Sequence, residues 1–87
     1  MSTFMLTISS PDGNKFQGRV TKFDVRGVEG ELAIMAGHIP FVTSVVRSKC
    51  TLWLEDGGKR SAQTEGGLLS VGSDGTTFIS GTFSFDD

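Results

Sequence analysis

Residues 4–20, FMLTISSPDGNKFQGRV, carry the pattern that decides the fold. The apolar side chains at positions 4, 6 and 8 alternate with those at 3, 5 and 7, so they share one face of an extended strand. Pro11-Asp12-Gly13-Asn14 follows, in which proline presets φ and glycine accepts a positive φ. Alternation then resumes at Phe16, Gly18 and Val20. The stretch therefore predicts two strands joined by a tight turn.

The same texture continues to the end of the chain, with short runs of Val, Ile, Thr and Phe separated by Gly and Asp. The apolar parity changes between Val20 and Phe23, which predicts a bulge near Thr21-Lys22 because the side-chain period of a strand is two. No stretch repeats apolar residues with a helical period over three turns. We therefore expect a single all-β domain over residues 1–87, with eight to ten short strands in a sandwich or barrel.

Composition excludes several classes of protein. The chain has 87 residues and a net charge of −2, which does not favour nucleic-acid binding. Cys50 is the only cysteine, so an internal disulfide and a cysteine-based zinc site are excluded, and a reducing compartment fits best. No apolar run approaches the length that spans a bilayer.

Candidate catalytic groups are few. His38 is the only histidine, and Cys50 alternates with leucines, which is typical of a buried core residue rather than a nucleophile. Glu29 and Glu31 could form a general acid/base pair, but a solvated acidic turn is the simpler interpretation. A metal site would combine His38 with these carboxylates. No motif that cradles a phosphate is present. The residues therefore point to a chain that catalyses no reaction and needs no cofactor.

One segment, Val28–Thr43, is dense in glycine, acidic and other distinctive residues. It resembles the signature G-x-E-G-E-L-G-I-x-P-G-H-x-P-L-[LV]-T of the epsilon subunit of F-type ATP synthases, which is called delta in mitochondria. The positions that match are Gly27, Glu29, Gly30, Glu31, Leu32, Ile34, Gly37, His38, Pro40 and Thr43. Ala33, Ala36 and Phe41 depart from the pattern, as changes of packing and turn.

The flanks extend the resemblance from about Phe4 to Phe85. Phe16-x-Gly18-x-Val20 and Gly66-Gly67-x-Leu69-x-Val71 are similar to family motifs upstream and downstream of the signature. The resemblance implies a two-sheet antiparallel β-sandwich. Family members usually continue into a two-helix domain, whereas this sequence offers no C-terminal helical hairpin. It is either a natural short form or a shortened version.

The resemblance implies a rotor subunit of the central stalk in the F1 sector, coupling gamma to the c-ring during proton-driven ATP synthesis. It implies peripheral association, through the complex, with the cytoplasmic face of a bacterial inner membrane, and no nucleotide bound by this chain. The family's c-ring loops carry arginine, so acid–base complementarity assigns Glu29, Gly30 and Glu31 to the c-ring. Gly27 and Gly30 are expected to give this turn a positive φ. Contacts with gamma are expected at Ser10, His38, Pro40, Phe41 and Thr43.

Two side chains next to Pro40 have an alternative interpretation. Phe41 is equally consistent with the core and with an interface, and Val42 is expected in the core. Two other functions also stay open. One is a free-standing sandwich that binds a peptide or carbohydrate, which would need an exposed aromatic platform. The other is a small metal-dependent enzyme using Glu29, Glu31 and His38.

Overall fold

The computed structural model describes residues 2–86, which form nine strands and no helix. The strands are β1 (Phe4–Ser10), β2 (Gly13–Gly27), β3 (Gly30–Ile34), β4 (Phe41–Val45), β5 (Ser48–Leu54), β6 (Lys59–Thr64), β7 (Gly67–Val71), β8 (Thr76–Ser80) and β9 (Phe83–Phe85). The all-β prediction with eight to ten strands is confirmed. A helix long and apolar enough to cross a membrane is absent from the described residues.

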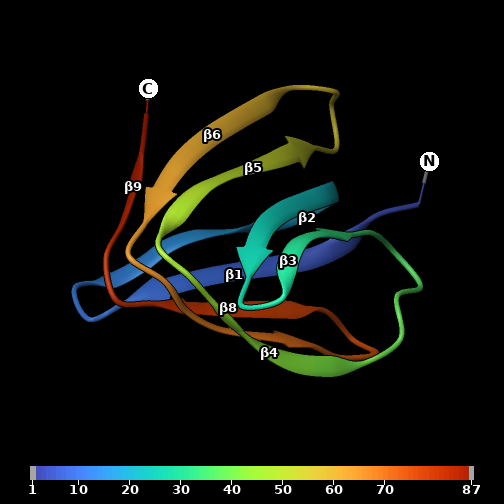
Figure 1. Ribbon diagram of the computed structural model, residues 1–87. Helices are drawn as coiled ribbons and strands as arrows, with labels where there is room; N and C mark the ends of the chain where they lie inside the picture. The colour runs from blue at the N-terminus through green and yellow to red at the C-terminus, as the bar shows by residue number, and fades with distance from the viewer. Residues whose placement is uncertain (1, 87) are drawn as a thin grey trace.

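The strands form two layers that share one strand (Figure 1). The first sheet contains β1, β8, β7 and β4, and the second contains β3, β5, β6 and β9. The 15-residue β2 belongs to both, because residues 13–20 pair with β1 while residues 20–27 pair with β5 and β3. All nine strands are therefore hydrogen-bonded in one continuous network.

A bulge lets β2 pass from one layer to the other. Val20 pairs with Leu54 and Lys22 pairs with Trp53, so Thr21 is the extra residue of β2. Val20 and Phe23 are both buried despite their opposite parity, because the bulge reverses which residues face inward. The bulge predicted near Thr21-Lys22 is confirmed.

One pairing differs from the antiparallel sandwich that the resemblance implies. β1 pairs in parallel with β8, from Leu6↔Thr76 to Ser9↔Ile79. Alternation within a strand fixes which side chains face inward but carries no information on the direction of its neighbour. The N-terminal strand lies between β2 and β8, antiparallel to the former and parallel to the latter.

Apolar side chains from both layers meet in one core. The rings of Phe23 from the second sheet and Phe78 from the first lie with their centroids 6.0 Å apart, and both are fully buried. Cys50 belongs to this core, as its alternation with leucines predicts. Burial raises the pKa of its thiol to about 12, with a smaller contribution from the negative charge of Asp86. The thiol is therefore protonated and inert at neutral pH.

Three short connections join the two layers at one end of the sandwich, namely residues 46–47, 65–66 and 81–82. At these corners the backbones approach closely. A side chain on Gly67 would place its Cβ 2.0 Å from the carbonyl oxygen of Ile79, which real structures do not show. Gly67 is therefore required by close packing of backbone on backbone, which explains the Gly66-Gly67 pair in the sequence.

Candidate functional site

The turn between β2 and β3 is a two-residue hairpin loop, Val28-Glu29, closed by the pair Gly27↔Gly30. Val28 is 61% exposed, and Glu29 and Glu31 are exposed beside it, as a docking turn requires. Gly30 has the expected positive φ, +129°. Gly27 does not, so that part of the prediction is wrong. A Cβ at this position would instead lie 3.1 Å from Cδ1 of Leu32, so a larger residue would require the Leu32 side chain to shift.

The hairpin is fastened to the edge of β4 near its turn. The amide of Val28 donates to the carbonyl of Ser44 over 3.2 Å, and the amide of Val46 donates to the carbonyl of Arg26 over 3.0 Å. A groove of about 400 Å³ runs between the two elements. Its lining combines residues predicted to contact different partners: Glu29, Gly30 and Glu31 on one side, and Phe41 and Thr43 on the other. The two predicted docking regions are therefore contiguous.

The segment between β3 and β4 carries His38 and Pro40, and both are exposed. The backbone amide of His38 donates to the carbonyl of Met35 over 3.2 Å, which closes a turn. Its Nδ1 lies 2.9 Å from the carbonyl oxygen of Ile39, and its ring centroid lies 5.0 Å from that of Phe41. His38 is thus held on the surface by the backbone and one aromatic neighbour.

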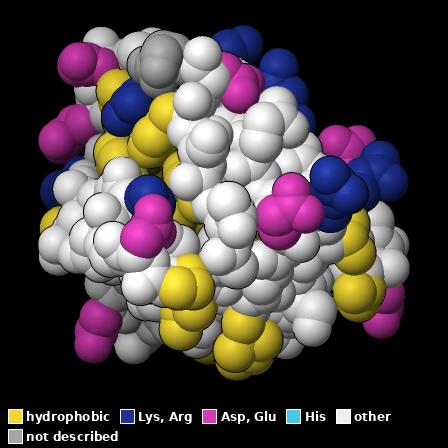
Figure 2. Space-filling view, turned by 90° about the vertical axis from the view of Figure 1, so that its left-hand side faces the viewer, with side chains coloured by type: hydrophobic (Ala, Val, Ile, Leu, Met, Phe, Trp, Pro, Cys, Tyr) yellow, Lys and Arg dark blue, Asp and Glu magenta, His cyan; other side chains and the backbone are white. Residues whose placement is uncertain are grey.

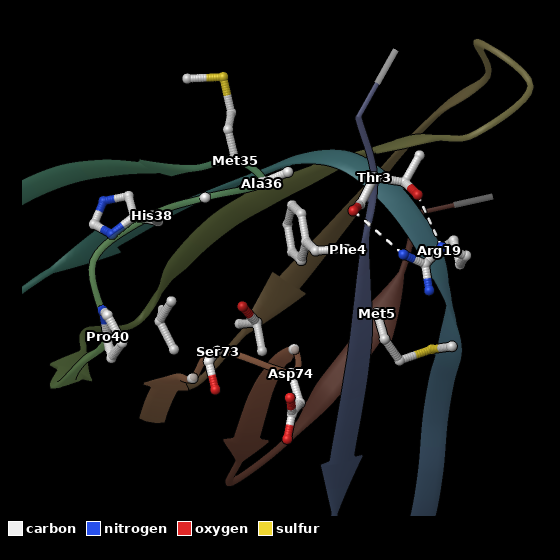
Figure 3. A pocket seen from close by; sticks show the side chains of 15 residues that line it. Thr3, Phe4, Met5, Arg19, Met35, Ala36, His38, Pro40, Ser73 and Asp74 are labelled. Carbon is white, nitrogen blue, oxygen red and sulfur yellow. Dashed lines mark hydrogen bonds between the residues drawn. The ribbon is translucent and has the colours of Figure 1, made fainter.

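This segment forms one wall of a pocket of about 330 Å³ (Figure 3). Phe4 lies between that wall and the turn that carries Ser73 and Asp74. On the far side, Nε of Arg19 donates to the hydroxyl of Thr3 over 2.8 Å. Within residues 2–86, no three His, Cys, Asp or Glu side chains lie close enough together to hold a metal ion. The combination of Glu29, Glu31 and His38 in one metal site is thus not seen in the described structure.

The register of β4 decides which of its side chains face out. Phe41 and Thr43 pair with Val71 and Leu69, whose side chains are buried, and are themselves half-buried. Val42 pairs with the exposed Ser70 and is 62% exposed, so its expected place in the core is wrong. A run of consecutive apolar residues does not reveal its own parity, and the pairing with β7 settles it.

Ser10 does not lie with the other predicted gamma contacts. It ends β1, three strands across the first sheet from β4. Its hydroxyl donates to the carboxylate of Asp12, which also accepts from Nζ of Lys15 over 2.9 Å. These hydrogen bonds, first that from Lys15 and then that from Ser10, lower the pKa of Asp12 to about 2. Ser10 thus fixes the turn between β1 and β2, away from β4.

A broad surface that sequence reasoning missed lies on the outside of the first sheet. Its side chains are exposed, neighbour one another across β4, β7 and β8, and carry no charge: Val42, Ser44, Leu68, Ser70, Thr77 and Ile79. We call this set the uncharged face. Figure 2 shows hydrophobic side chains along the lower edge of the molecule, the side on which Figure 1 draws β4 and β8. The adjacent Leu68-Leu69 was a signal, because neighbours in a strand face opposite ways and one of the two leucines must be exposed.

Comparison with known proteins agrees with the resemblance. Residues 3–85 match the family model described as "ATP synthase, Delta/Epsilon chain, beta-sandwich domain". The ATP synthase epsilon chain of an Exiguobacterium species is 34% identical over 87 residues, which are 100% of this chain and 64% of that protein. The epsilon chain of Rhodopseudomonas palustris is 34% identical over 79 residues, 91% of this chain and 58% of that one. The chain thus spans less than two thirds of the length of these relatives.

Solved structures share the fold at lower identity. A chain of the Euglena gracilis mitochondrial ATP synthase, in a structure of its OSCP, F1 and c-ring, superposes with a TM-score of 0.91 at 22% identity, covering 98% of this chain and 54% of that one. A chain in the central stalk and c-ring of the Tetrahymena thermophila mitochondrial enzyme gives 0.75 at 12% identity, over 94% and 66%. The sandwich architecture and the non-catalytic character expected from the sequence agree with these findings. The chain belongs to the family of ATP synthase delta/epsilon chains, and it matches their β-sandwich domain.

Proposed function

We propose that this chain is part of a rotor subunit of the central stalk of a proton-transporting ATP synthase, in which the β-sandwich couples gamma to the c-ring. The observation that carries the proposal is the placement of an exposed acidic hairpin beside a broad uncharged surface, on a fold of this family. The hairpin and the surface are contiguous through β4, so one small body offers two kinds of contact.

The uncharged face supports the contact with gamma. Exposed apolar side chains that neighbour one another on one face mark interaction surfaces, and the core of an interface is depleted of charge. Val42, Leu68 and Ile79 are 62%, 46% and 54% exposed. The predicted contacts Phe41 and Thr43 lie on the same strand as Val42, and His38 and Pro40 lie just before it. Ser10 lies apart from these residues, next to Ser9, which pairs with Ile79 of β8.

The acidic hairpin supports the contact with the c-ring. Glu29 and Glu31 flank Gly30 on an exposed loop and can meet arginine side chains of ring loops. Exposed ion pairs contribute about 0.2–1 kcal/mol each, so they set orientation more than affinity. Affinity for the rotor then comes mainly from the uncharged face.

In this role the chain binds no nucleotide or cofactor and catalyses no reaction. It associates with the cytoplasmic face of a bacterial inner membrane only through its protein partners. The alternative of a carbohydrate-binding module needs an exposed aromatic platform. The only tryptophan, Trp53, is half-buried, and Nζ of Lys22 lies 4.7 Å from its ring centroid. This arrangement favours the docking function over that alternative.

Size-exclusion chromatography with purified gamma tests the proposal. The expected result is a one-to-one complex at micromolar concentration, with no nucleotide hydrolysis by the chain alone. A variant with a charge in the uncharged face, Leu68→Lys, is expected to lose the complex while its circular dichroism stays unchanged. Failure of the wild-type chain to bind gamma would contradict the proposal.

A further inference from the structure

The free edge of β3 is a second surface with unmet hydrogen-bonding capacity. Among residues 2–86, β3 pairs only with β2. The backbone groups of a strand point alternately to either side, and the carbonyl of Arg26 points away from β3, toward Val46. Arg26 pairs with Glu31 across the hairpin, so the N–H and C=O groups of Glu31 point away from β2, and those of Ala33 do the same. These groups lie on an exposed edge.

The side chains along this edge leave a notch. Ala33 pairs with Asp24, and both lie on the outer face of the second sheet. Because alanine is small, a depression of about 190 Å³ remains over it, lined by Asp24, Glu31, Leu32 and Ala33. Two carboxylates therefore meet at one hollow next to unpaired backbone groups.

The carboxylate of Asp24 is incompletely paired. Its Oδ1 is buried and accepts no hydrogen bond from any of the described residues; its one cation is the ammonium of Lys22, an ion pair at 3.8 Å that is too long for a hydrogen bond. The side chain as a whole is 39% exposed, so the exposed part lies on its other atoms. A carboxylate in this state favours an additional cation, because hydrogen bonds to a charged acceptor are stronger than neutral ones.

We propose that the edge of β3 receives an extended segment of a partner protein that carries an arginine or lysine. The segment pairs with Glu31 and Ala33 through backbone hydrogen bonds, and its cationic side chain enters the notch between Asp24 and Glu31. This is strand addition, in which the backbone supplies affinity and one side-chain pocket supplies specificity. The proposal uses Glu31 but does not require that the hairpin meets the c-ring.

Charge identifies the occupant. The edge strand and its turn present only acidic charged side chains, Glu29 and Glu31, while the basic Arg26 and Lys22 lie on the neighbouring β2. An incoming basic segment is therefore complementary to the edge itself. A second copy of this chain would bring the same acidic edge and be repelled, which is how charged residues protect edge strands from pairing with themselves.

A peptide titration followed by NMR tests this surface on the intact chain. The probe is the blocked peptide Thr-Val-Thr-Arg-Thr-Val-Thr, added at millimolar concentration to the isotope-labelled protein. A single short strand gains little after the entropy of ordering, so weak binding is expected. The amide signals of Glu31 and Ala33 should shift, and replacing the peptide's arginine by glutamate should weaken binding about tenfold.

Controls on the peptide leave the protein's fold untouched. Methylation of alternate peptide nitrogens, at the positions that face β3, should abolish the shifts, whereas methylation of the other nitrogens should not. Shifts that centre on the uncharged face, shifts that appear without peptide as protein concentration rises, or no shifts at all would each overturn the proposal.

Two substitutions of Ala33 test the backbone hydrogen bonds and the notch independently of each other. Ala33→Pro removes an N–H that the β2 ladder does not use, so the sheet should tolerate it and peptide binding should be lost. Ala33→Val keeps the N–H and fills the notch, so it should remove only the preference for arginine over glutamate, and Ala33→Ser is the matched control. Both variants should still bind gamma. A wild-type chain that binds the peptide but not gamma would contradict the proposed function and leave this inference standing.

Discussion

The two sheets of the sandwich carry different kinds of side chain on their outer faces. The uncharged face of the first sheet offers only apolar and hydroxyl side chains. The corresponding surface of the second sheet, which we call the charged face, includes Lys22, Asp24, Arg26, Glu31, Lys49, Thr51, Trp53 and Lys59. Folding depends on the inward side chains of both sheets, so the outward ones are free to reflect what each face meets. Under the proposed function, the uncharged face meets gamma, whereas the charged face meets partners only along its edge at Glu31.

The largest expected effect is on stability, and it distinguishes the buried side of β7 from its exposed side. Leu69 is fully buried, whereas its neighbour Leu68 is 46% exposed. Leu69→Ala is expected to lower the free energy of unfolding by about 2–5 kcal/mol, because it leaves a cavity in the core. Leu68→Ala should lower it by less than about 1 kcal/mol. Urea denaturation measures both, and equal losses would show that Leu68 serves stability rather than docking.

The next effect compares the two faces directly. Leu68→Lys puts a charge in the uncharged face and should weaken binding of gamma about a hundredfold, or about 2.7 kcal/mol. Thr51→Lys puts the same charge in the charged face and should leave the affinity unchanged. Isothermal titration calorimetry with purified gamma measures both variants. If the two substitutions weaken gamma equally, the assignment of the faces is wrong.

A smaller effect distinguishes the hairpin from the uncharged face. Glu31→Lys reverses one charge at an exposed site and should weaken binding to an isolated c-ring about fivefold, the upper range for an exposed pair. Its affinity for gamma should not change, since the uncharged face is intact. Binding to detergent-solubilised rings at low and high salt provides the measurement, and the difference should shrink at high salt. Equal loss toward both partners would contradict the separation of the two contacts.

The smallest expected effect is on the reaction rate of cysteine thiols. The pKa of the Cys50 thiol is raised to about 12 by burial, so a thiol reagent should not modify the folded wild-type chain at neutral pH. The favourable effect of the neutral thiol on stability is fully present below its ordinary pKa of 9.0 and is lost as the pH rises toward 12.

Because Cys50 does not react, a single cysteine introduced on either face shows, by its rate of reaction, whether gamma covers that face. Leu68→Cys and Thr51→Cys should both react in the free chain, with nearly unchanged stability. Gamma should slow the reaction only at position 68, and mass spectrometry measures the rates. Protection at position 51 instead would exchange the roles of the two faces.

Alternation was enough to predict the all-β class, the bulge at Thr21 and the burial of Cys50, because these depend on local parity alone. The parallel neighbour of β1 and the outward direction of Val42 were not predictable in this way. Both depend on which strand lies alongside, which is a property of the assembled sheet.

The candidate site, like the fold, was predicted only where it depends on neighbouring residues in the sequence. The exposed turn at Glu29 and Glu31 follows from its glycines and its acidic residues. The uncharged face is made of residues from three strands that only the assembled sheet brings together, such as Leu68 and Ile79, which pair across β7 and β8. The notch at Ala33 depends on its partner Asp24, which comes from the neighbouring strand.

The sharing of β2 between both layers has a mechanical consequence. A force applied to the hairpin at Val28-Glu29 enters the second sheet and reaches the first along a covalent backbone, through the bend at Thr21. Side-chain contacts between two stacked sheets can slide, but a continuous chain cannot. We therefore expect a displacement of the hairpin to be transmitted to the first sheet through β2.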